Sequence, residues 1–188
     1  MKHIIKISLI FSILVLTLFS CRHDGTPEDI HEHEEIEKLV VTLTNKSDAS
    51  DKQVIQYIGG ISDKSIDLKT GATYTVALDF QVKHDDHYHS VNEEILEEKE
   101  EHFVTYEFSN SDVQVTRTNA EEKRTDGNLV GMQTEWKFVG GDANGKIGIK
   151  LVHMPSSIEQ NFPSATNQQG KTNGGESDVN ALINWVKK

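Results

Sequence analysis

The sequence is poor in cysteine, since Cys21 is the only one among 188 residues. An intramolecular disulfide is therefore excluded, even in a compartment whose redox state permits one. The folded part of the chain must be stabilised by packing alone. A chain of this length folded as one domain buries about 70% of its unfolded surface, which is enough for a core without covalent cross-links.

The sequence also lacks the common signatures of catalysis. It contains no serine nucleophile elbow, no His-Glu-x-x-His helix, no glycine loop that cradles phosphate and no cysteine nucleophile. The segments DGN at 126–128 and DANGK at 142–146 lack the alternating acids and the terminal glutamate of an EF-hand, so we expect hairpin turns there. These absences predict a binding protein rather than an enzyme.

Positive charge is scarce. The chain has 19 lysines and arginines against 30 aspartates and glutamates, and its formal net charge is −11 at neutral pH. Such a surface repels nucleic acid and anionic lipid headgroups, and it favours cations or basic partners. Nucleic-acid binding is therefore excluded as a function.

The longest apolar run is short and lies near the N-terminus. It covers residues 7–19, follows Lys2 and Lys6, and is shorter than the roughly 20 apolar residues that span a bilayer. The order of basic residues, apolar run and small residue is typical of a secretory signal. The tail LFSC at 18–21 is similar to a bacterial lipobox, in which the cysteine is acylated and becomes the first mature residue. A cleaved signal without lipidation is the alternative.

These segments predict the domain organisation and the location. Residues 1–20 are the lipoprotein signal peptide, residues 21–35 form a flexible acidic tether with the lipidated Cys21, and residues 36–188 form the folded domain. Two or more acyl chains hold a protein durably at a membrane. We therefore expect a protein of the cell envelope, anchored to the outer membrane on its periplasmic or surface face. Its expected partners are the membrane and an envelope protein or transporter.

Alternation of apolar and polar residues predicts that the domain is mainly β. The clearest strand is TYTVALDFQVK at 73–83, whose alternate residues from Tyr74 to Val82 are apolar. Further strands are predicted at 36–44, 53–58, 65–69, 104–108, 112–118, 132–138, 147–151 and 179–185. About nine strands with frequent turns and little helix predict an immunoglobulin-like antiparallel β-sandwich with one short helix.

The one helix is predicted in HSVNEEILEEKEEHF at 89–103. Ser90 and Glu93 have the spacing of a capping box, and the glutamates of the first turn suit the helix dipole. The segment 156–175 is long for a loop inside a compact domain. Loops of this length are either functional or disordered, and the sequence leaves both alternatives open.

Three segments carry a resemblance to a known family: NEEILEEKEEHFVTY at 92–106, KIGIKLVHMP at 146–155 and GGESDVNALINWV at 174–186. With the lipobox and the acidic opening, they resemble a family of uncharacterised lipoproteins of Bacteroidota-type bacteria. That family is often grouped with type 1 periplasmic binding folds, which are two-lobed α/β structures of nearly twice this length, whereas the strand pattern predicts a sandwich. The resemblance implies no established activity. Its members usually lack the histidines of VKHDDHYHS at 82–90, so any role for these is specific to this chain.

Three histidines are predicted to face inward at strand ends. His84, His102 and His153 each lie two residues from an apolar residue on the inner face of a strand. If successive strands run antiparallel, all three lie at one pole of the domain, together with the beginning of the first strand. His31 and His33, and the pair His87 and His89, are expected at the same pole.

The candidate site therefore combines seven histidines: His31, His33, His84, His87, His89, His102 and His153. Carboxylates flank them at Asp85, Asp86, Glu32, Glu34, Glu35 and Glu98. Neutral imidazole with carboxylate suits Zn²⁺, Ni²⁺ or Cu²⁺, and the absence of thiols favours an exchangeable, partly exposed site. The alternative is that these histidines only bond loop carbonyls or titrate. The protein is then a structural or protein- and glycan-binding sandwich of the envelope without a metal.

Overall fold

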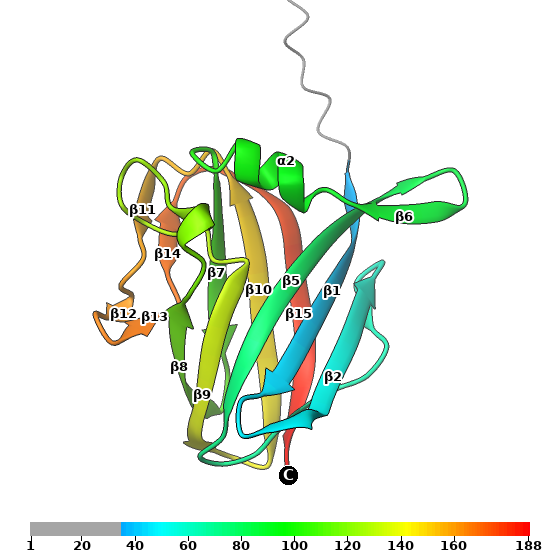
Figure 1. Ribbon diagram of the computed structural model, residues 1–188, viewed down its shortest axis with the longest axis vertical. Coiled ribbons are helices and arrows are strands. Elements are labelled where there is room, and N and C mark those ends of the chain that lie inside the picture. Colours follow the sequence, from blue (N-terminus) through cyan, green and yellow to red (C-terminus); the bar gives the residue numbers. More distant parts are fainter. Residues whose placement is uncertain (1–34) are drawn as a thin grey trace, which may run out of the picture. The chain divides into compact units, whose positions relative to one another are not determined.

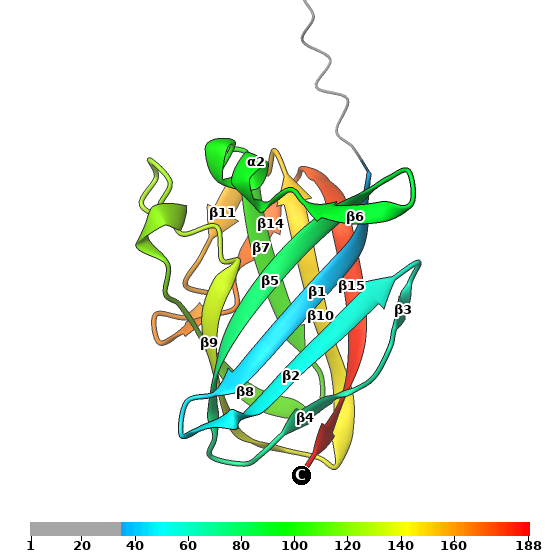
Figure 2. The same ribbon diagram turned by 45° about the vertical axis from the view of Figure 1, so that its right-hand side comes forward.

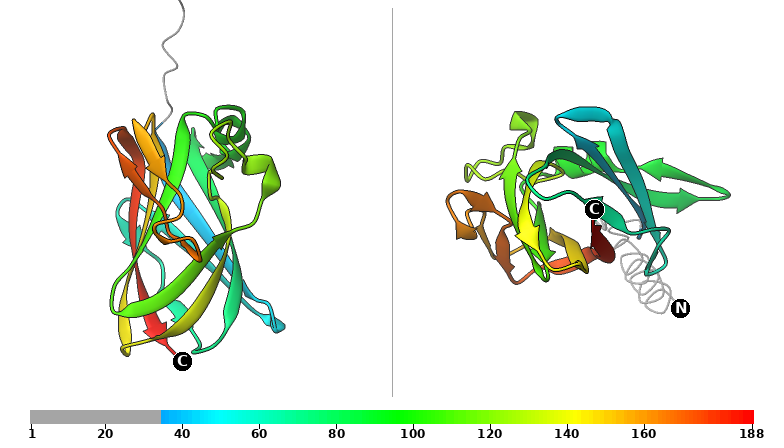
Figure 3. Two further views of the ribbon diagram at one scale, coloured as in Figure 1. Left: turned by 90° about the vertical axis from the view of Figure 1, so that its left-hand side faces the viewer. Right: turned by 90° about the horizontal axis from the view of Figure 1, so that it is seen from below.

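Residues 35–188 are described by the computed structural model. They form two main sheets that face each other and curl into a half-barrel, with two small two-stranded sheets beside them (Figures 1 and 2). Seen from below, the two sheets lie on opposite sides of the core (Figure 3). The β-sandwich predicted from the alternation is confirmed.

The larger sheet has seven strands, in the order β3-β2-β1-β5-β9-β8, with β6 beside the end of β5. All of its pairings are antiparallel. Its strands are β1 (Ile36–Asn45), β2 (Asp48–Ile58), β3 (Ile61–Ser62), β5 (Thr73–His84), β6 (His87–Ser90), β8 (Ser111–Arg117) and β9 (Gln133–Gly141).

The smaller sheet has four strands in the order β4-β15-β10-β7. Its strands are β4 (Ile66–Leu68), β7 (His102–Phe108), β10 (Asn144–His153) and β15 (Glu176–Lys187). β4 runs parallel to β15 and pairs only with its last residues, 185–187. Within residues 35–188, the preceding part of β15, 176–184, is paired on one side only, with β10.

All nine predicted strands are present, as β1, β2, β4, β5, β7, β8, β9, β10 and β15. Their inward residues form one core between the sheets, in which Trp136 and Trp185 are the largest fully buried side chains. The Trp185 ring meets Phe138 edge-on, with ring centroids 5.3 Å apart. Apolar burial on this scale supplies the main stabilising free energy of a domain without disulfides.

The predicted helix is present but shorter, and its cap was predicted wrongly. α2 spans Asn92–Glu97, and its N-cap is Val91, which makes no side-chain capping bond. Ser90 belongs to β6, where its hydroxyl only accepts a 3.3 Å bond from the Asn92 amide. Val91 and Ile95 are both buried under the helix. Their burial decides where the helix begins, because packing outweighs a capping preference of about 1 kcal/mol.

The segment 156–175 is ordered and forms two small hairpins. β11 (Ser157–Glu159) pairs with β14 (Lys171–Asn173), and β12 (Pro163–Ser164) pairs with β13 (Asn167–Gln168). The buried Asn167 side chain fastens the inner hairpin to β8: its Oδ1 accepts from the Val115 amide at 3.1 Å and its Nδ2 donates to the Val113 carbonyl at 3.0 Å.

Arg117, at the end of β8, is a buried cation whose five N–H groups all donate to backbone carbonyls. The carbonyls belong to Val104 on β7, to 129–130 and to 168–169, at 2.7–3.2 Å. Burial lowers the pKa of Arg117 to about 10, so the guanidinium is still charged at neutral pH. A Cβ at Gly131 or Gly170, both at positive φ, would clash with the guanidinium at 2.5 Å or less.

Glu122 is the buried anion near this cation. Its segment is the 3₁₀ turn η2 (Ala120–Glu122), and its carboxylate accepts from the amides of Gly131, Met132 and Gln133 at 2.6–2.9 Å. Burial raises the pKa of Glu122, and the three amide bonds oppose that shift. Arg117 and Glu122 are thus both satisfied by backbone groups, and they fix 129–133 between them.

We predict that Arg117→Met lowers the free energy of unfolding by about 3 kcal/mol or more, because five carbonyls lose a charged donor. The carbonyls of Val130 and Gln169 each keep one bond, from the amides of Val104 and Tyr106. Urea denaturation of the folded domain measures this change. Lys137→Met, on the exposed face of the neighbouring strand β9, is the matched control and should stay within about 0.5 kcal/mol of the wild type. An Arg117→Met variant as stable as the control contradicts the role assigned to the guanidinium.

Candidate functional site

Three histidines lie on one face of the hairpin formed by β5 and β6. His84 is paired directly with His87, and His89 is paired with Val82, two residues before His84 on the same strand face. The ring centroids are 6.1 Å apart for His84 and His87, 6.2 Å for His84 and His89, and 6.5 Å for His87 and His89. We call these three residues the hairpin histidines.

His84 and His87 are exposed, with 61% and 64% of their side-chain surface accessible. Each has an aspartate beside its Nδ1: Asp85 at 3.5 Å from His84 and Asp86 at 3.4 Å from His87. His84 continues the strand face of the buried Val82, as predicted, but it is not covered by the domain. β1 begins opposite Val82, so β5 runs past the end of its neighbour before it reaches His84, and the hairpin projects from the body of the domain (Figure 1).

His102 and His153 form a second, buried group. They are paired across β7 and β10, only 4% and 8% exposed, and their rings stack with centroids 5.0 Å apart. The prediction that both face inward is confirmed. His102 Nδ1 lies 3.1 Å from the Glu98 carbonyl, which can only accept, so this nitrogen carries the proton. Carboxylates lie on the other side: Glu101 at 3.2 Å from His153 Nε2 and Asp178 at 3.7 Å from His102 Nε2.

The pKa of His102 is lowered, mainly by burial and also by the neighbouring His153. The bond to the Glu98 carbonyl and the charge of Asp178 oppose this shift without cancelling it. His102 is therefore neutral at neutral pH. A stacked pair of this kind fastens the ends of β7 and β10 to each other.

The predicted common pole is confirmed for the histidines among residues 35–188, but these histidines do not form one group. In Figure 1 the end of β5, the beginnings of β1 and β7 and the end of β10 all lie at the same end of the domain. Five of the predicted ligands nevertheless separate into the hairpin histidines and the buried pair. Among residues 35–188, no group of three or more His, Cys, Asp or Glu side chains is already arranged to hold a metal ion.

Several predicted features lie outside the residues that the structure describes. They are the signal peptide 1–20, the lipidation site Cys21, the tether up to residue 34, His31, His33 and the carboxylates of Glu32 and Glu34. Glu35, the remaining tether residue, is exposed and lies directly before β1.

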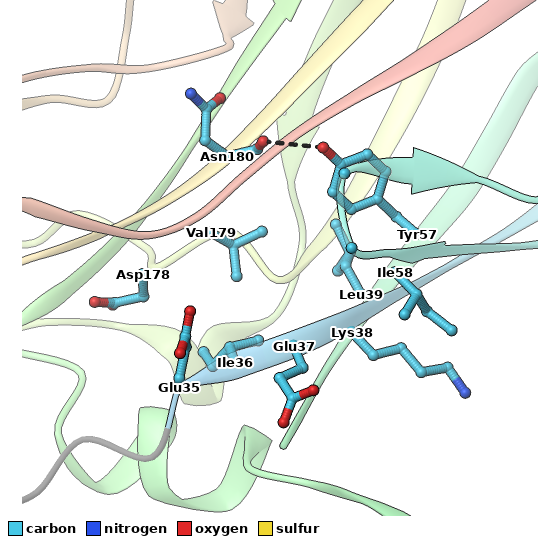
Figure 4. Close-up of a pocket in the computed structure, with 12 residues that line it drawn as sticks. Glu35, Ile36, Glu37, Lys38, Leu39, Tyr57, Ile58, Asp178, Val179 and Asn180 are labelled. Carbon is cyan, nitrogen blue, oxygen red and sulfur yellow. Dashed lines mark hydrogen bonds between the residues drawn. The ribbon is translucent and has the colours of Figure 1, made fainter. Parts of the chain in front are cut away.

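A groove of about 460 Å³ opens between β1 and β15. Its walls are the beginning of β1 from Glu35 to Leu39, the end of β2 with Gly59 and Gly60, and residues 178–180 of β15. The Tyr57 hydroxyl crosses it and donates to the Asn180 carbonyl at 3.4 Å (Figure 4). Asp178 belongs to both places, because it lines the groove and faces His102.

The sequence interpretation did not identify the carboxylates Glu101 and Asp178 or the groove. Glu101 directly precedes His102, and Asp178 belongs to the segment GESD before the last predicted strand. Their positions as acids near predicted strand ends are the sequence signal that could have identified them. The groove had no such signal, because it exists only where the pairing of β15 with β4 stops.

Comparison with known protein families, with curated proteins and with solved structures found no match to this chain. In the part of the chain from residue 35 onward, none of the helices has the length and apolar character needed to cross a membrane.

We predict that acidification below about pH 6.5 destabilises the domain through His102. The pKa of His102 is lower in the folded state than in the unfolded state, so the unfolded state binds the proton first and stability falls as the pH falls. One such group changes the free energy of unfolding by at most about 1.4 kcal/mol per pH unit. Denaturation at a series of pH values measures this slope.

His102→Asn retains a donor for the Glu98 carbonyl but cannot be protonated, so its slope between pH 7 and the acid range should be smaller than that of the wild type. The neighbouring groups Asp178, Glu101 and His153 are unchanged in this variant. His87→Asn, on the exposed hairpin, is the control and should keep the wild-type slope. Equal slopes for His102→Asn and the wild type contradict the assignment.

Proposed function

We propose that this protein is a lipid-anchored binding protein of the cell envelope that holds a divalent transition-metal ion, Zn²⁺ or Cu²⁺, on the hairpin histidines. The observation that supports the metal site is the placement of three imidazoles on one face of a hairpin whose turn has only two residues, Asp85 and Asp86. Imidazole is a preferred ligand of both ions.

The hairpin backbone holds the three rings close to a ligating geometry. Three imidazole nitrogens at about 2.1 Å from a zinc ion require ring centroids roughly 5 Å apart. The observed separations are 6.1–6.5 Å, so side-chain rotation can close the site without moving the strands. Asp85 and Asp86, beside the Nδ1 atoms, orient the rings and add negative charge near the ion.

Exposure makes this an exchangeable site rather than a structural one. Three protein ligands leave the fourth position of a tetrahedral zinc ion to water or to a ligand from another molecule. An exposed ion with one open position suits transfer to an envelope protein or transporter. His31 and His33 precede β1 in the sequence and belong to this proposal as additional ligands from the tether.

The anchor is the second part of the proposal. The basic residues, the apolar run and LFSC at 18–21 support a signal peptide over residues 1–20 and acylation of Cys21. The resemblance to lipoproteins of Bacteroidota-type bacteria supports the same location. With the acyl chains in the outer membrane, the tether 21–35 gives the domain reach from the membrane surface.

The metal site is tested by titration calorimetry with ZnCl₂ or CuCl₂ on residues 21–188 carrying Cys21→Ser, which removes the one thiol that competes for metal. We expect binding in the micromolar range or tighter. His84→Ala or His87→Ala should weaken it at least about tenfold, since the loss of one ligand removes on the order of 1.4 kcal/mol or more.

Lys83→Ala, on the opposite face of the same hairpin, is the matched control and should bind as the wild type does. His102→Asn should also leave metal binding unchanged, because the buried pair is a separate group. If the combined variant His84→Ala, His87→Ala and His89→Ala binds as tightly as the wild type, the hairpin is not the metal site.

The anchor is tested separately by fractionation of a bacterium that expresses the full chain. We expect the wild type to incorporate labelled palmitate and to sediment with membranes, and Cys21→Ser to do neither. Ser20→Ala, which leaves the cysteine in place, is the control. A Cys21→Ser variant that still sediments with membranes contradicts acylation as the anchor.

A further inference from the structure

We infer that the groove between β1 and β15 binds an extended, lysine- or arginine-rich segment of a partner protein, as an added strand along β15. This site lies on other residues than the hairpin histidines, and the inference does not depend on the metal. It rests on an open strand edge, on the shape of the groove and on its charge.

The open edge belongs to β15. Among residues 35–188, the stretch 176–184 of this strand pairs with β10 on one side and with no strand on the other. An unpaired strand edge presents amide and carbonyl groups that another chain can pair with. The same edge already pairs with a strand near its C-terminal end, where Ile66–Leu68 of β4 lies parallel to residues 185–187.

The backbone of Asn180 shows which groups face the groove. Its carbonyl accepts from the Tyr57 hydroxyl, which lies across the groove from β15 (Figure 4). In an antiparallel pair, residues opposite each other alternate between exchanging both backbone bonds and exchanging neither. Asn180, paired with Lys150, therefore directs both its carbonyl and its amide away from β10 and into the groove.

The groove has room for such a segment. Its volume of about 460 Å³ lies in the range of ligand sites, and its rim at Gly59 and Gly60 is open, since a Cβ added at either residue meets no atom within 4 Å. Apolar contact surface is available beside it. Ile58 is 39% exposed at the wall, and Ile61, its partner across β2 and β3, is 74% exposed.

Charge selects the partner. Three acids line the groove, Glu35, Glu37 and Asp178, and Figure 4 shows Glu35 and Asp178 at the same end of it, on opposite walls. The one cation of the lining, Lys38, lies over the ring of Tyr88 on β6, 5.0 Å from its centroid. The field in the groove is therefore negative, and it favours a segment with lysine or arginine side chains.

The same charge disfavours two other occupants. Residues 22–34 contain five acidic residues and one arginine, so their charge does not complement that of the groove. A second copy of the chain brings a formal net charge of −11. Both occupants are nevertheless distinguishable outcomes of the experiment.

The inference is tested with a fluorescein-labelled peptide of alternating lysine and valine, roughly ten residues long, which is the upper end of strand length. Fluorescence anisotropy measures its binding to residues 21–188 with Cys21→Ser and without added metal. We expect saturable binding that weakens at high salt. A peptide of alternating glutamate and valine should not bind.

Two variants separate the strand edge from the charge. Asn180→Pro removes the amide that faces the groove while sparing the bonds to β10, and it should weaken binding at least about tenfold. Glu37→Lys should weaken it by a similar factor through charge alone. Glu107→Lys, on the exposed face of β7, is the matched control and should bind as the wild type does. Circular dichroism establishes that each variant is folded.

Several results overturn the inference. The first is that the glutamate peptide binds as tightly as the lysine peptide. The second is that a folded Asn180→Pro variant or the Glu37→Lys variant binds the lysine peptide as the wild type does. If Asn180→Pro does not fold, the result for Glu37→Lys decides alone. A dimer in analytical ultracentrifugation that Asn180→Pro dissociates assigns the groove to a second copy. If removal of residues 21–34 makes the lysine peptide bind at least about tenfold more tightly, the groove is assigned to the tether. A failure of the metal titration leaves all these readouts unchanged.

Discussion

The buried guanidinium of Arg117 is the interaction on which the arrangement of this domain depends. Its five bonds to carbonyls join the end of β8 to β7, to 129–130 and to the hairpins of 156–175. The carbonyls of Val130 and Gln169 also accept backbone amides, and the guanidinium gives each a second, charged donor. The sandwich is therefore closed tightly on the β7 and β8 side, and the half-barrel opens on the opposite side, between β1 and β15.

The histidines divide according to how far each strand extends past its neighbours. β7 begins where its neighbour β10 ends, so His102 and His153 are paired and stack beside the helical connection and its acids. β5 continues beyond β1 into a hairpin, so the three hairpin histidines stand in solvent. One pole of the domain thus carries a buried pair that belongs to the structure and an exposed group that suits an exchangeable ligand.

The groove and the hairpin are adjacent parts of this pole. Lys38, from the wall of the groove, packs on Tyr88 of the hairpin, and Asp178, from the opposite wall, faces the buried pair. The proposed binding of a basic segment and of a metal ion depends on the negative surface, the open strand edge and the hairpin histidines of this pole.

The sequence by itself determined the strands, because the alternation of apolar residues is a local property that a half-buried strand requires along its whole length. The sequence analysis predicted the strand at 112–118 but not the buried role of Arg117 within it, because no local pattern indicates the five carbonyls that its guanidinium meets. Only the tertiary structure decided that Val91 rather than Ser90 begins α2, that His84 is exposed, and that β15 has an open edge. Each of these features depends on where a neighbouring element ends. The local sequence of one strand does not determine where another strand ends.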